Sequence, residues 1–305
     1  MSNPDTTLTP VKALVAPVLD DTSRAQIRAE RLSAFVRYSL LITVGFLMLY
    51  PLLWLVGASF KTNSEIYGSI GFIPQEPTLE GYRKGWETST PYTFGRFFWN
   101  TFLIILPKTI FTAISCALVA YGFARFEFPY KKLLFASLIA TLLLPNVVTR
   151  IPQYILFRDL GWLDTYLPLW VPSAFAGDAF FVFMLVQFLR AIPRDMEEAA
   201  RVDGANSLQT LIYIVVPMLM PALISVALFQ FMWTMNDFLG PLIYLSSVQS
   251  FPVSLALKLS IDTTEAFDWN RILAMSVLAL LPALIVFFMA QRYFIEGIST
   301  GGVKG

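Results

Sequence analysis

Six polar or aromatic side chains lie in stretches of the chain that are otherwise apolar, and their chemistry is recognition rather than bond breaking. They are Lys108, Asn146, Asp178, Trp233, Asn236 and Asp237. Ionisable groups are costly inside a bilayer, so within a membrane helix they are functional candidates. Amines, amides and carboxylates can hydrogen-bond a polar solute. The alternative is that these groups hold helices together, with Lys108 paired to Asp178 or to a partner subunit.

The sequence offers little for catalysis. The chain has no histidine and one cysteine, Cys116, which lies in an apolar run, so imidazole catalysis, histidine-based metal sites and an intrachain disulfide are excluded. We expect Cys116 to be a small buried residue. No Gly-Lys dipeptide is present, so the chain lacks a Walker A phosphate loop. We therefore expect no enzyme activity, no metal site and no cofactor bound by this chain. A net charge of +1 does not favour a nucleic-acid partner.

A charged segment over residues 194–206 interrupts the apolar sequence. Pro193 suits the first turn of a helix, and the acidic residues that follow are favoured near a helix N-terminus. Gly204 can end that helix in a left-handed conformation, and Asn206 or Ser207 can cap a second helix. The pattern predicts a short helix, a turn and another helix lying across a membrane face. Its incomplete apolar face suits a groove in a partner protein; alternatively, the segment is a linker resting on lipid headgroups.

The elements that must position these residues are membrane helices. Hydrophobic residues make up 56% of the chain and charged residues 14%, with a mean hydropathy of +0.62, whereas a soluble domain carries about 25% charge. A span needs about 20 apolar residues. The sequence predicts an all-α integral membrane protein with a domain over residues 34–295 and six spans, near 38–60, 100–124, 133–157, 167–190, 212–236 and 272–292. Because Asp178 and two prolines disturb the fourth span, five spans plus a re-entrant piece is the alternative.

The distribution of lysine and arginine indicates the orientation. The N-terminal tail, the second and fourth connections and the C-terminal tail together hold more of these residues than the other connections, which favours cytoplasmic N- and C-termini. The charged segment, between spans four and five, then faces the cytoplasm. Residues 1–33 have no short apolar core followed by a cleavage site, so we expect a flexible cytoplasmic tail with a helical end rather than a signal peptide. Residues 296–305 form a second cytoplasmic tail.

The charged segment resembles a known signature. Glu198-Ala199-Ala200 is followed after three residues by Gly204, after nine more by Ile214, and then by Val216-Pro217. This spacing is similar to the EAA signature of binding-protein-dependent ABC importer permeases, with Val216 where that family usually has leucine. Further segments resemble the maltose-type carbohydrate branch and its MalG-like subunit, and they are residues 60–67, 72–74, 77–79, 121–126, 192–194, 236–238, 241–243 and 297–305. The resemblance covers nearly the whole chain from about residue 35.

The resemblance implies a permease subunit of an ATP-driven importer for oligosaccharides, forming half of the pathway across the bacterial inner membrane. The short charged helix would be a coupling helix that sits in a cleft of a cytoplasmic ATPase. Its implied contact residues are Glu197, Glu198, Ala199, Ala200, Asp203 and Gly204. Implied partners are a second homologous permease in a heterodimer, two ATPase subunits that use ATP and Mg, the lipid bilayer, and an extracytoplasmic solute-binding protein reached by residues 245–270.

The sequence is compatible with several kinds of cargo. The polar side chains named first would line a sugar path, with aromatic faces such as Trp233 and Phe231 stacking on sugar rings. Lys108 with Arg150 would suit an acidic saccharide. The same machinery could carry an amino acid, a polyamine or phosphate. An ion-coupled secondary carrier would need paired inverted repeats, which the sequence does not show, and an intramembrane enzyme would need catalytic groups that it lacks.

Overall fold

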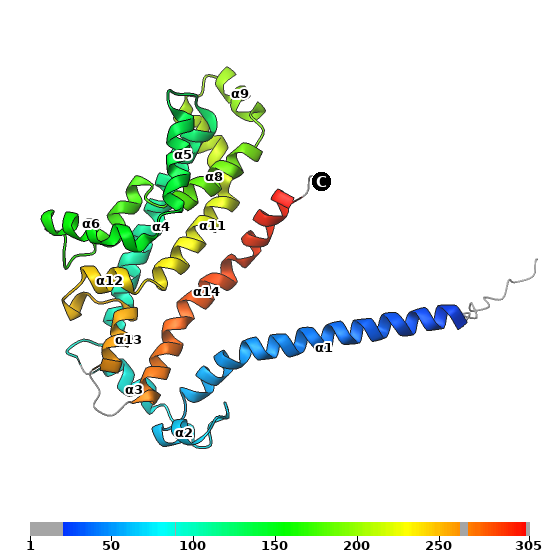
Figure 1. Ribbon diagram of the computed structural model, residues 1–305, viewed down its shortest axis with the longest axis vertical. Helices are drawn as coiled ribbons and strands as arrows, with labels where there is room; N and C mark the ends of the chain where they lie inside the picture. The colour runs from blue at the N-terminus through cyan, green and yellow to red at the C-terminus, as the bar shows by residue number, and fades with distance from the viewer. Residues whose placement is uncertain (1–20, 89, 263–267, 303–305) are drawn as a thin grey trace, which may run out of the picture. The chain divides into compact units, whose positions relative to one another are not determined.

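The computed structural model describes residues 21–88, 90–262 and 268–302, and over these residues it is helical, without strands (Figure 1). The chain divides into two units, Met1–Trp54 and Leu55–Gly305. The first unit consists, in its described part, of the helix α1 (Asp21–Ala58), which ends in the second unit. The apolar part of α1 runs from Ala29, with a mean hydropathy of 2.2. The helix thus begins N-terminal to the predicted first span, within the range expected to be a tail.

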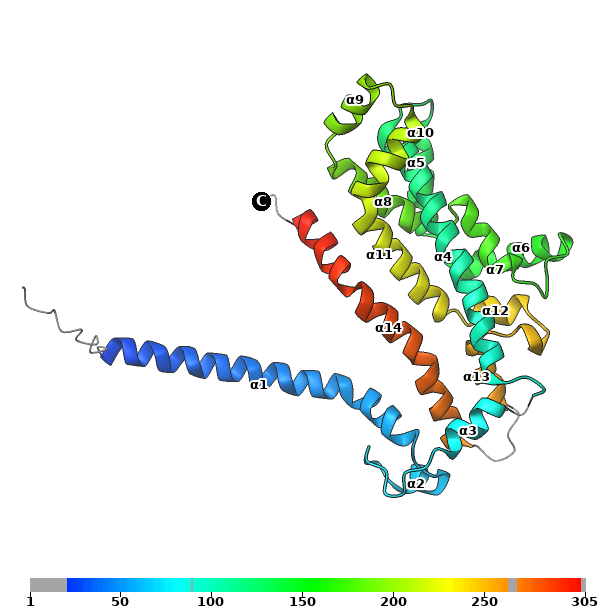
Figure 2. The same cartoon turned by 180° about the vertical axis from the view of Figure 1, so that it is seen from behind.

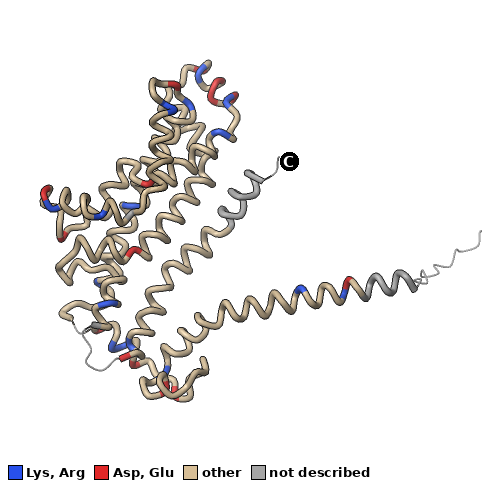
Figure 3. The backbone as a smooth tube through the Cα atoms, in the orientation of Figure 1, with Lys and Arg blue, Asp and Glu red and all other residues tan. Residues whose placement is uncertain are grey.

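The second unit is built on long helices that pack side by side. α11 (Val216–Met235) lies between α4 (Phe94–Arg125) and α14 (Trp269–Gly302), as both views show (Figure 1, Figure 2). α8 (Ala179–Ala191) also packs against α4 and α11. Charged residues gather near the ends of this unit and on α6, and most of α11 and α14 is free of charge (Figure 3).

One apolar cluster joins α4, α8 and α11 and forms the main core. Its members include Cys116 and Ala120 of α4, Leu185 of α8, and Leu219 and Val226 of α11, all with no exposed surface. Small side chains on α4 permit close approach of the neighbouring helices, as is typical of membrane bundles. The prediction that Cys116 is a buried small residue is confirmed.

Five described helices are long and apolar enough to cross a membrane, and they are Ala29–Ala58, Phe94–Arg125, Leu167–Ala191, Ser207–Met235 and Trp269–Gln291. A sixth span exists only if a bent pair of helices counts as one. The predicted membrane fold is confirmed, while the count of six depends on this pair.

Residues 133–157, predicted as the third span, do not form one straight helix. The region folds as α5 (Lys131–Leu142) and α6 (Asn146–Asp159), which are bent by 103° at the break between them. Pro145 explains the break because it has no N–H to donate and disfavours a helical conformation at the residue before it. The amides of Leu143 and Leu144 instead bond three residues back, to Ala140 at 3.1 Å and Thr141 at 3.2 Å, which tightens and ends α5.

The predicted fourth span is present but interrupted. It consists of α7 (Leu167–Trp170), the 3-10 helix η1 (Val171–Phe175) and α8, with the break at residues 176–178. Ala176 has a positive φ of 53°. At Gly177, a Cβ atom would come within 2.9 Å of the Pro172 carbonyl oxygen, so the turn requires glycine there.

Short helices fill the connections. α2 (Asn63–Gly68) and α3 (Glu80–Glu87) lie at one end of the second unit. α12 (Leu239–Tyr244), the 3-10 helix η3 (Val248–Ser250) and α13 (Val253–Asp262) connect α11 to α14. α9 (Asp195–Val202), α10 (Ser207–Thr210) and the π-helix η2 (Leu211–Val215) connect α8 to α11 at the opposite end.

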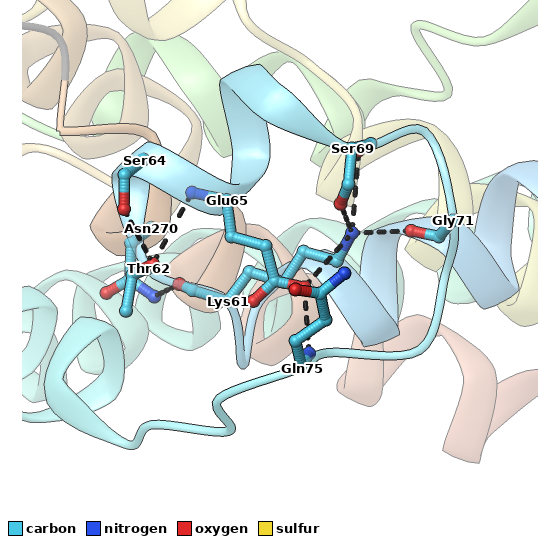
Figure 4. Close-up of polar contacts among 8 residues, drawn as sticks. All are labelled: Lys61, Thr62, Ser64, Glu65, Ser69, Gly71, Gln75 and Asn270. Atoms are coloured by element: carbon cyan, nitrogen blue, oxygen red, sulfur yellow. Dashed lines mark hydrogen bonds and ion pairs between the residues drawn. The ribbon is translucent and has the colours of Figure 1, made fainter.

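A buried lysine organises the end of the unit that carries α2 (Figure 4). Lys61 is 1% exposed, and its Nζ lies 2.7 Å from Ser69 Oγ, 2.5 Å from the Gly71 carbonyl oxygen and 3.7 Å from Glu65 Oε1. Asn270, at the start of α14, donates from Nδ2 to the Lys61 carbonyl oxygen. A buried charge is tolerated only when it is paired and hydrogen-bonded. Lys61 therefore closes the α2 loop and ties it to α14.

We predict that Lys61→Met destabilises the protein by about 3 kcal/mol, because it leaves the Glu65 carboxylate and several acceptors buried without their partner. The matched control is Lys84→Met. Lys84 pairs with Glu80 at 2.7 Å with the same i,i+4 spacing, but its side chain is 50% exposed, so its loss should cost much less than the loss of Lys61. Thermal unfolding of the purified protein in detergent measures both. Equal effects of the two substitutions would contradict the central role of Lys61.

Candidate functional site

The predicted helix, turn and helix in the charged segment are present. α9 ends at Val202, and Gly204, two residues later, has a φ of +88°. The Gly204 amide donates to the Arg201 carbonyl at 3.0 Å and the Ala205 amide to the Ala200 carbonyl at 2.9 Å, a pair of bonds that defines a Schellman C-cap. Asn206 then caps α10, with Asn206 Oδ1 and Gln209 Oε1 each accepting a backbone amide of the other residue at 2.9 Å. Local chemistry thus fixes the turn on both sides.

A buried ion pair fastens α9 to the end of α4. Glu197 Oε1 lies 2.6 Å from Arg125 Nε, and the two side chains are 4% and 3% exposed. The Arg125 N–H is not aligned for a hydrogen bond in this pair, so the contact is chiefly electrostatic. Arg125 Nη2 also donates to the Ile192 carbonyl at 3.1 Å. A cation in the last turn of α4 is further favoured by the helix dipole.

Two more polar contacts join the segment to α4. Arg194 Nη2 donates to the Ala124 carbonyl at 3.2 Å, and the Tyr121 hydroxyl lies 3.5 Å from the Ser207 carbonyl. The first contact holds the start of α9, and the second holds the residue that opens α10. With the Arg125–Glu197 pair, these contacts attach the segment to α4 at several points along its length.

The structure divides the six predicted contact residues into an inner and an outer set. Glu197 faces Arg125, while Glu198, Ala199, Asp203 and Gly204 are exposed and Ala200 is half-buried. Met196 and Val202 add exposed apolar surface on α9, at 52% and 87%. Sequence reasoning did not identify Arg125 as the partner of Glu197, although Arg125 lies in the segment 121–126 that carries part of the resemblance. The outer set is the part available to another protein.

We predict that Glu197→Gln or Arg125→Met destabilises the protein by about 3 kcal/mol, because either change leaves a buried charge unpaired. The double variant should lose much less than the sum of the two. Glu198→Gln is the control, since Glu198 is exposed on the same helix. Thermal unfolding gives the energies, and hydrogen exchange over residues 195–206 shows whether α9 loosens locally. Strictly additive losses would argue against the pair.

A polar cavity of about 420 Å³ lies among α4, α6, η1, α11 and α12. Its wall contains four of the six side chains that the sequence singled out, Lys108, Asp178, Trp233 and Asp237. The structure adds polar groups that sequence reasoning left out or mentioned only in passing, and these are Thr149, Arg150, Gln153, Ser173, Gln230 and Tyr244. The charges in the wall balance, with Lys108 and Arg150 against Asp178 and Asp237. Lys108 and Asp178 share the cavity, but no ion pair joins them in the part of the chain described.

Two further residues predicted for the path, Asn236 and Phe231, are not among the described residues of this wall. Asn236 is exposed and donates from Nδ2 to the Met232 carbonyl at 2.8 Å, so it helps to end α11. Asn146 opens α6, and its side chain lies outside the described set. Phe231, suggested as a stacking ring, is 7% exposed and belongs to the packed interior. The structure therefore does not bring Asn236 or Phe231 to the described wall of the cavity.

Trp233 gives the cavity an exposed aromatic face, and Gln230 gives it a buried amide. Trp233 is 47% exposed and packs on Phe181, with ring centroids 4.9 Å apart. Gln230 is 2% exposed; its Nε2 bonds Thr234 Oγ1 at 3.0 Å, and its Oε1 has no partner among the described residues. An unpaired buried acceptor costs about 1–3 kcal/mol. Because Gln230 is uncharged, the charge pattern of the sequence does not single it out.

The connections beside the cavity are held by Asp164, between α6 and α7. The Ser247 hydroxyl donates to Asp164 Oδ2, and the amides of Ser247 and Ser246 donate to Oδ1 at 2.9 and 3.0 Å. These bonds lower the pKa of Asp164, the Ser247 hydroxyl most of all. The Asp164 amide also donates to the carbonyl of Tyr244 at 2.8 Å. The amide of Asp164 thus holds Tyr244 beside the cavity, while its carboxylate holds the two serines that follow.

The fold and these two sites define a multi-span membrane protein with a polar cavity and a short helix presented at one end, the class of a transport permease. Residues 109–300 match the model of the family described as binding-protein-dependent transport system inner membrane component, and the chain belongs to this family. The predicted resemblance is confirmed.

Relatives and a solved structure agree with the family. The chain is 31% identical over 269 residues to the osmoprotective compounds uptake permease protein GgtD of Synechocystis, covering 87% of this chain and 90% of that protein. It is 29% identical to the diacetylchitobiose uptake system permease protein NgcG of Streptomyces coelicolor, covering 92% of each. A bacterial ABC transporter that imports the acidic polysaccharide alginate shares the fold, with a TM-score of 0.73 and 23% identity over 88% of this chain and 98% of that one.

Proposed function

We propose that this chain is one of two permease subunits in an ATP-driven importer of a neutral oligosaccharide in the bacterial inner membrane. The observation that carries the proposal is the cavity in which polar side chains and an exposed tryptophan face one space. Family membership supplies the transport class, and the cavity supplies the chemistry of the cargo. The second permease subunit would complete the path as a heterodimer, and a solute-binding protein would deliver the cargo on the side opposite α9.

The lining favours a neutral, hydroxyl-rich cargo. A saccharide needs both donors and acceptors, which amide, phenol, carboxylate and ammonium groups offer together, and its ring can lie against an aromatic face. The alternative of an acidic saccharide rested on Lys108 and Arg150. Asp178 and Asp237 share that cavity and offset the two cations, so the wall has no net preference for an anion. The diacetylchitobiose permease among the relatives supports a sugar.

A non-sugar cargo is the second candidate, since another relative carries osmoprotective compounds. An ion-coupled carrier would leave the exposed face of α9 without a partner. Transport by the purified importer separates these possibilities: uptake that persists without any ATPase subunit favours the carrier, and competition by amino acids or polyamines but not by sugars favours the second cargo class.

We predict that Trp233→Ala lowers the rate of sugar uptake at limiting cargo by about fivefold, the loss expected when one aromatic contact of about 1 kcal/mol is removed. Trp233→Phe should retain most of the rate because a ring remains. Trp99→Ala is the control, since Trp99 is 62% exposed and lies outside the cavity wall. Uptake of a panel of neutral and acidic saccharides into proteoliposomes measures the effect. Equal losses from Trp99→Ala and Trp233→Ala would oppose the assigned path.

We also propose that α9 is the coupling helix and that its outer residues contact an ATPase subunit, where ATP and Mg are used. The support is the contrast between the two glutamates. Glu197 is paired with Arg125 within the chain, while Glu198 is exposed beside the small side chain of Ala199. A carboxylate on such a surface can form a charge-assisted contact, and small neighbours allow a partner to approach closely. In this arrangement the α9 end, with both termini, is cytoplasmic.

Glu198→Lys should abolish ATP-driven uptake, because it reverses the charge at the contact with the ATPase. Cargo binding to the solute-binding protein should be unchanged. Glu198→Asp, which keeps the charge, is expected to retain partial uptake. Co-purification of the ATPase subunits and ATP-dependent uptake are the two measurements. Normal assembly and uptake with Glu198→Lys would show that Glu198 has no coupling role.

A further inference from the structure

A second large cavity lies at the α9 end of the unit and has no role in the proposed path. Its volume is about 650 Å³, and it is bordered by the end of α4, the start of α5 and the end of α8. Three of its side chains are cations, Lys131, Lys132 and Arg190, and Glu127 is its one carboxylate. The rest of the wall is aromatic or aliphatic, formed by Phe123, Phe128, Tyr130, Leu133 and Phe135.

The positive charge in this cavity is only partly neutralised. Lys131 Nζ lies 2.8 Å from Glu127 Oε1 and 2.8 Å from the Phe126 carbonyl, which accounts for the one acidic group; the bond lowers the pKa of Glu127. Arg190 stacks over the Phe135 ring at 5.3 Å without an ion pair in the described chain. Lys132 is exposed and forms neither an ion pair nor a hydrogen bond with a described residue. Two cations are thus left for an external anion.

The apolar wall narrows the kind of anion. The Phe123 ring packs 5.7 Å from Phe128 and 5.4 Å from Phe135, so aromatic surface lies directly beside the free cations. Leu133 and Leu134 continue that surface along α5, 63% and 50% exposed. A water-soluble anion would gain nothing from this surface, whereas a phospholipid presents a phosphate and acyl chains together. Tyr130 is 77% exposed beside them, and tyrosine is enriched where a membrane meets water.

We propose that this cavity binds an anionic phospholipid, with its phosphate between Lys132 and Arg190 and its acyl chains along Phe128, Leu133 and α5. Basic pockets between membrane helices on the cytoplasmic side are suited to anionic headgroups. The bound lipid would link the α4–α5 connection to the end of α8, immediately before Arg194 and α9. This site depends on the proposed cytoplasmic placement of the α9 end and is independent of the cargo.

The test is lipid retention by the complete importer, purified in detergent and measured by native mass spectrometry with phosphatidylglycerol, phosphatidylcholine and soluble glycerol phosphate as separate probes. Wild type should retain phosphatidylglycerol over phosphatidylcholine. The variant Lys132→Gln with Arg190→Gln should weaken phosphatidylglycerol retention on the order of 30-fold, as expected for the loss of two cations near a membrane surface. Lys132→Arg with Arg190→Lys should keep it, which guards against a folding defect.

The control removes two cations elsewhere, with Lys84→Gln and Arg158→Gln, both from exposed ion pairs, and should leave retention unchanged. Equal retention of the two lipids, retention unaffected by Lys132→Gln with Arg190→Gln, or competition by glycerol phosphate as strong as by lipid would each overturn the proposal. The proposal would also be overturned if the ATPase subunits, in lipid-free detergent, protected the Lys132 amine from chemical labelling. That result would assign the cavity to a protein partner. Because uptake of cargo is not measured, these outcomes are separate from those that test the transport path.

Discussion

The ion pair between Arg125 and Glu197 is the constraint on which the α9 end of the molecule depends. Arg125 terminates a long apolar helix, and Glu197 sits in the first turn of a short amphipathic one. Neither charge is exposed to water, so each requires the other, and separation of α9 from α4 would leave two uncompensated charges. The pair also determines which side of α9 faces outward. With Glu197 turned inward, α9 presents the opposite side, which carries Glu198 and Ala199, to the outside.

The polar cavity follows from a second constraint, which concerns the backbone. Within a bilayer, non-helical backbone is tolerated only where protein or a wet cavity satisfies it. Two interruptions and one end of the membrane helices border the same cavity. The α5–α6 break precedes Thr149 and Arg150, residues 176–178 include Asp178, and the turn after the end of α11 contains Asp237. At that last turn, Asp237 Oδ1 accepts the Gly240 amide at 3.0 Å. The breaks that weaken the helices thus also bring polar groups into one space.

Sequence reasoning succeeded where local chemistry decides the structure and failed where distant residues do. Pro193, Gly204 and Asn206 act on their own neighbours, so the turn after α9 was predictable. Hydropathy located the spans because lipid acts on each helix separately. The inward direction of Glu197 depends on Arg125, which is remote in the sequence.

The effect of a proline is also not predictable from local sequence. Pro107 and Pro282 lie inside continuous helices, while Pro145 ends one, and the difference depends on the neighbouring helices. Gln230 carries no charge, so only packing revealed it.

The connection from α9 to the cavity passes through a distorted helix. The π-helix η2 lies between the capped start at Asn206 and Pro217. A wider turn here accommodates a proline that cannot donate to the preceding turn and would otherwise clash with a carbonyl of that turn.

C-terminal to η2, α11 is packed into the core it shares with α4, and close-packed interiors transmit displacement. Because α9 is bonded to α4 and connected to α11 through α10 and η2, a force on α9 acts on both helices. These two helices carry Lys108 and Trp233, whereas Arg150 and Tyr244 belong to α6 and α12. Under the proposed coupling, motion of α9 therefore shifts one wall of the cavity against the other.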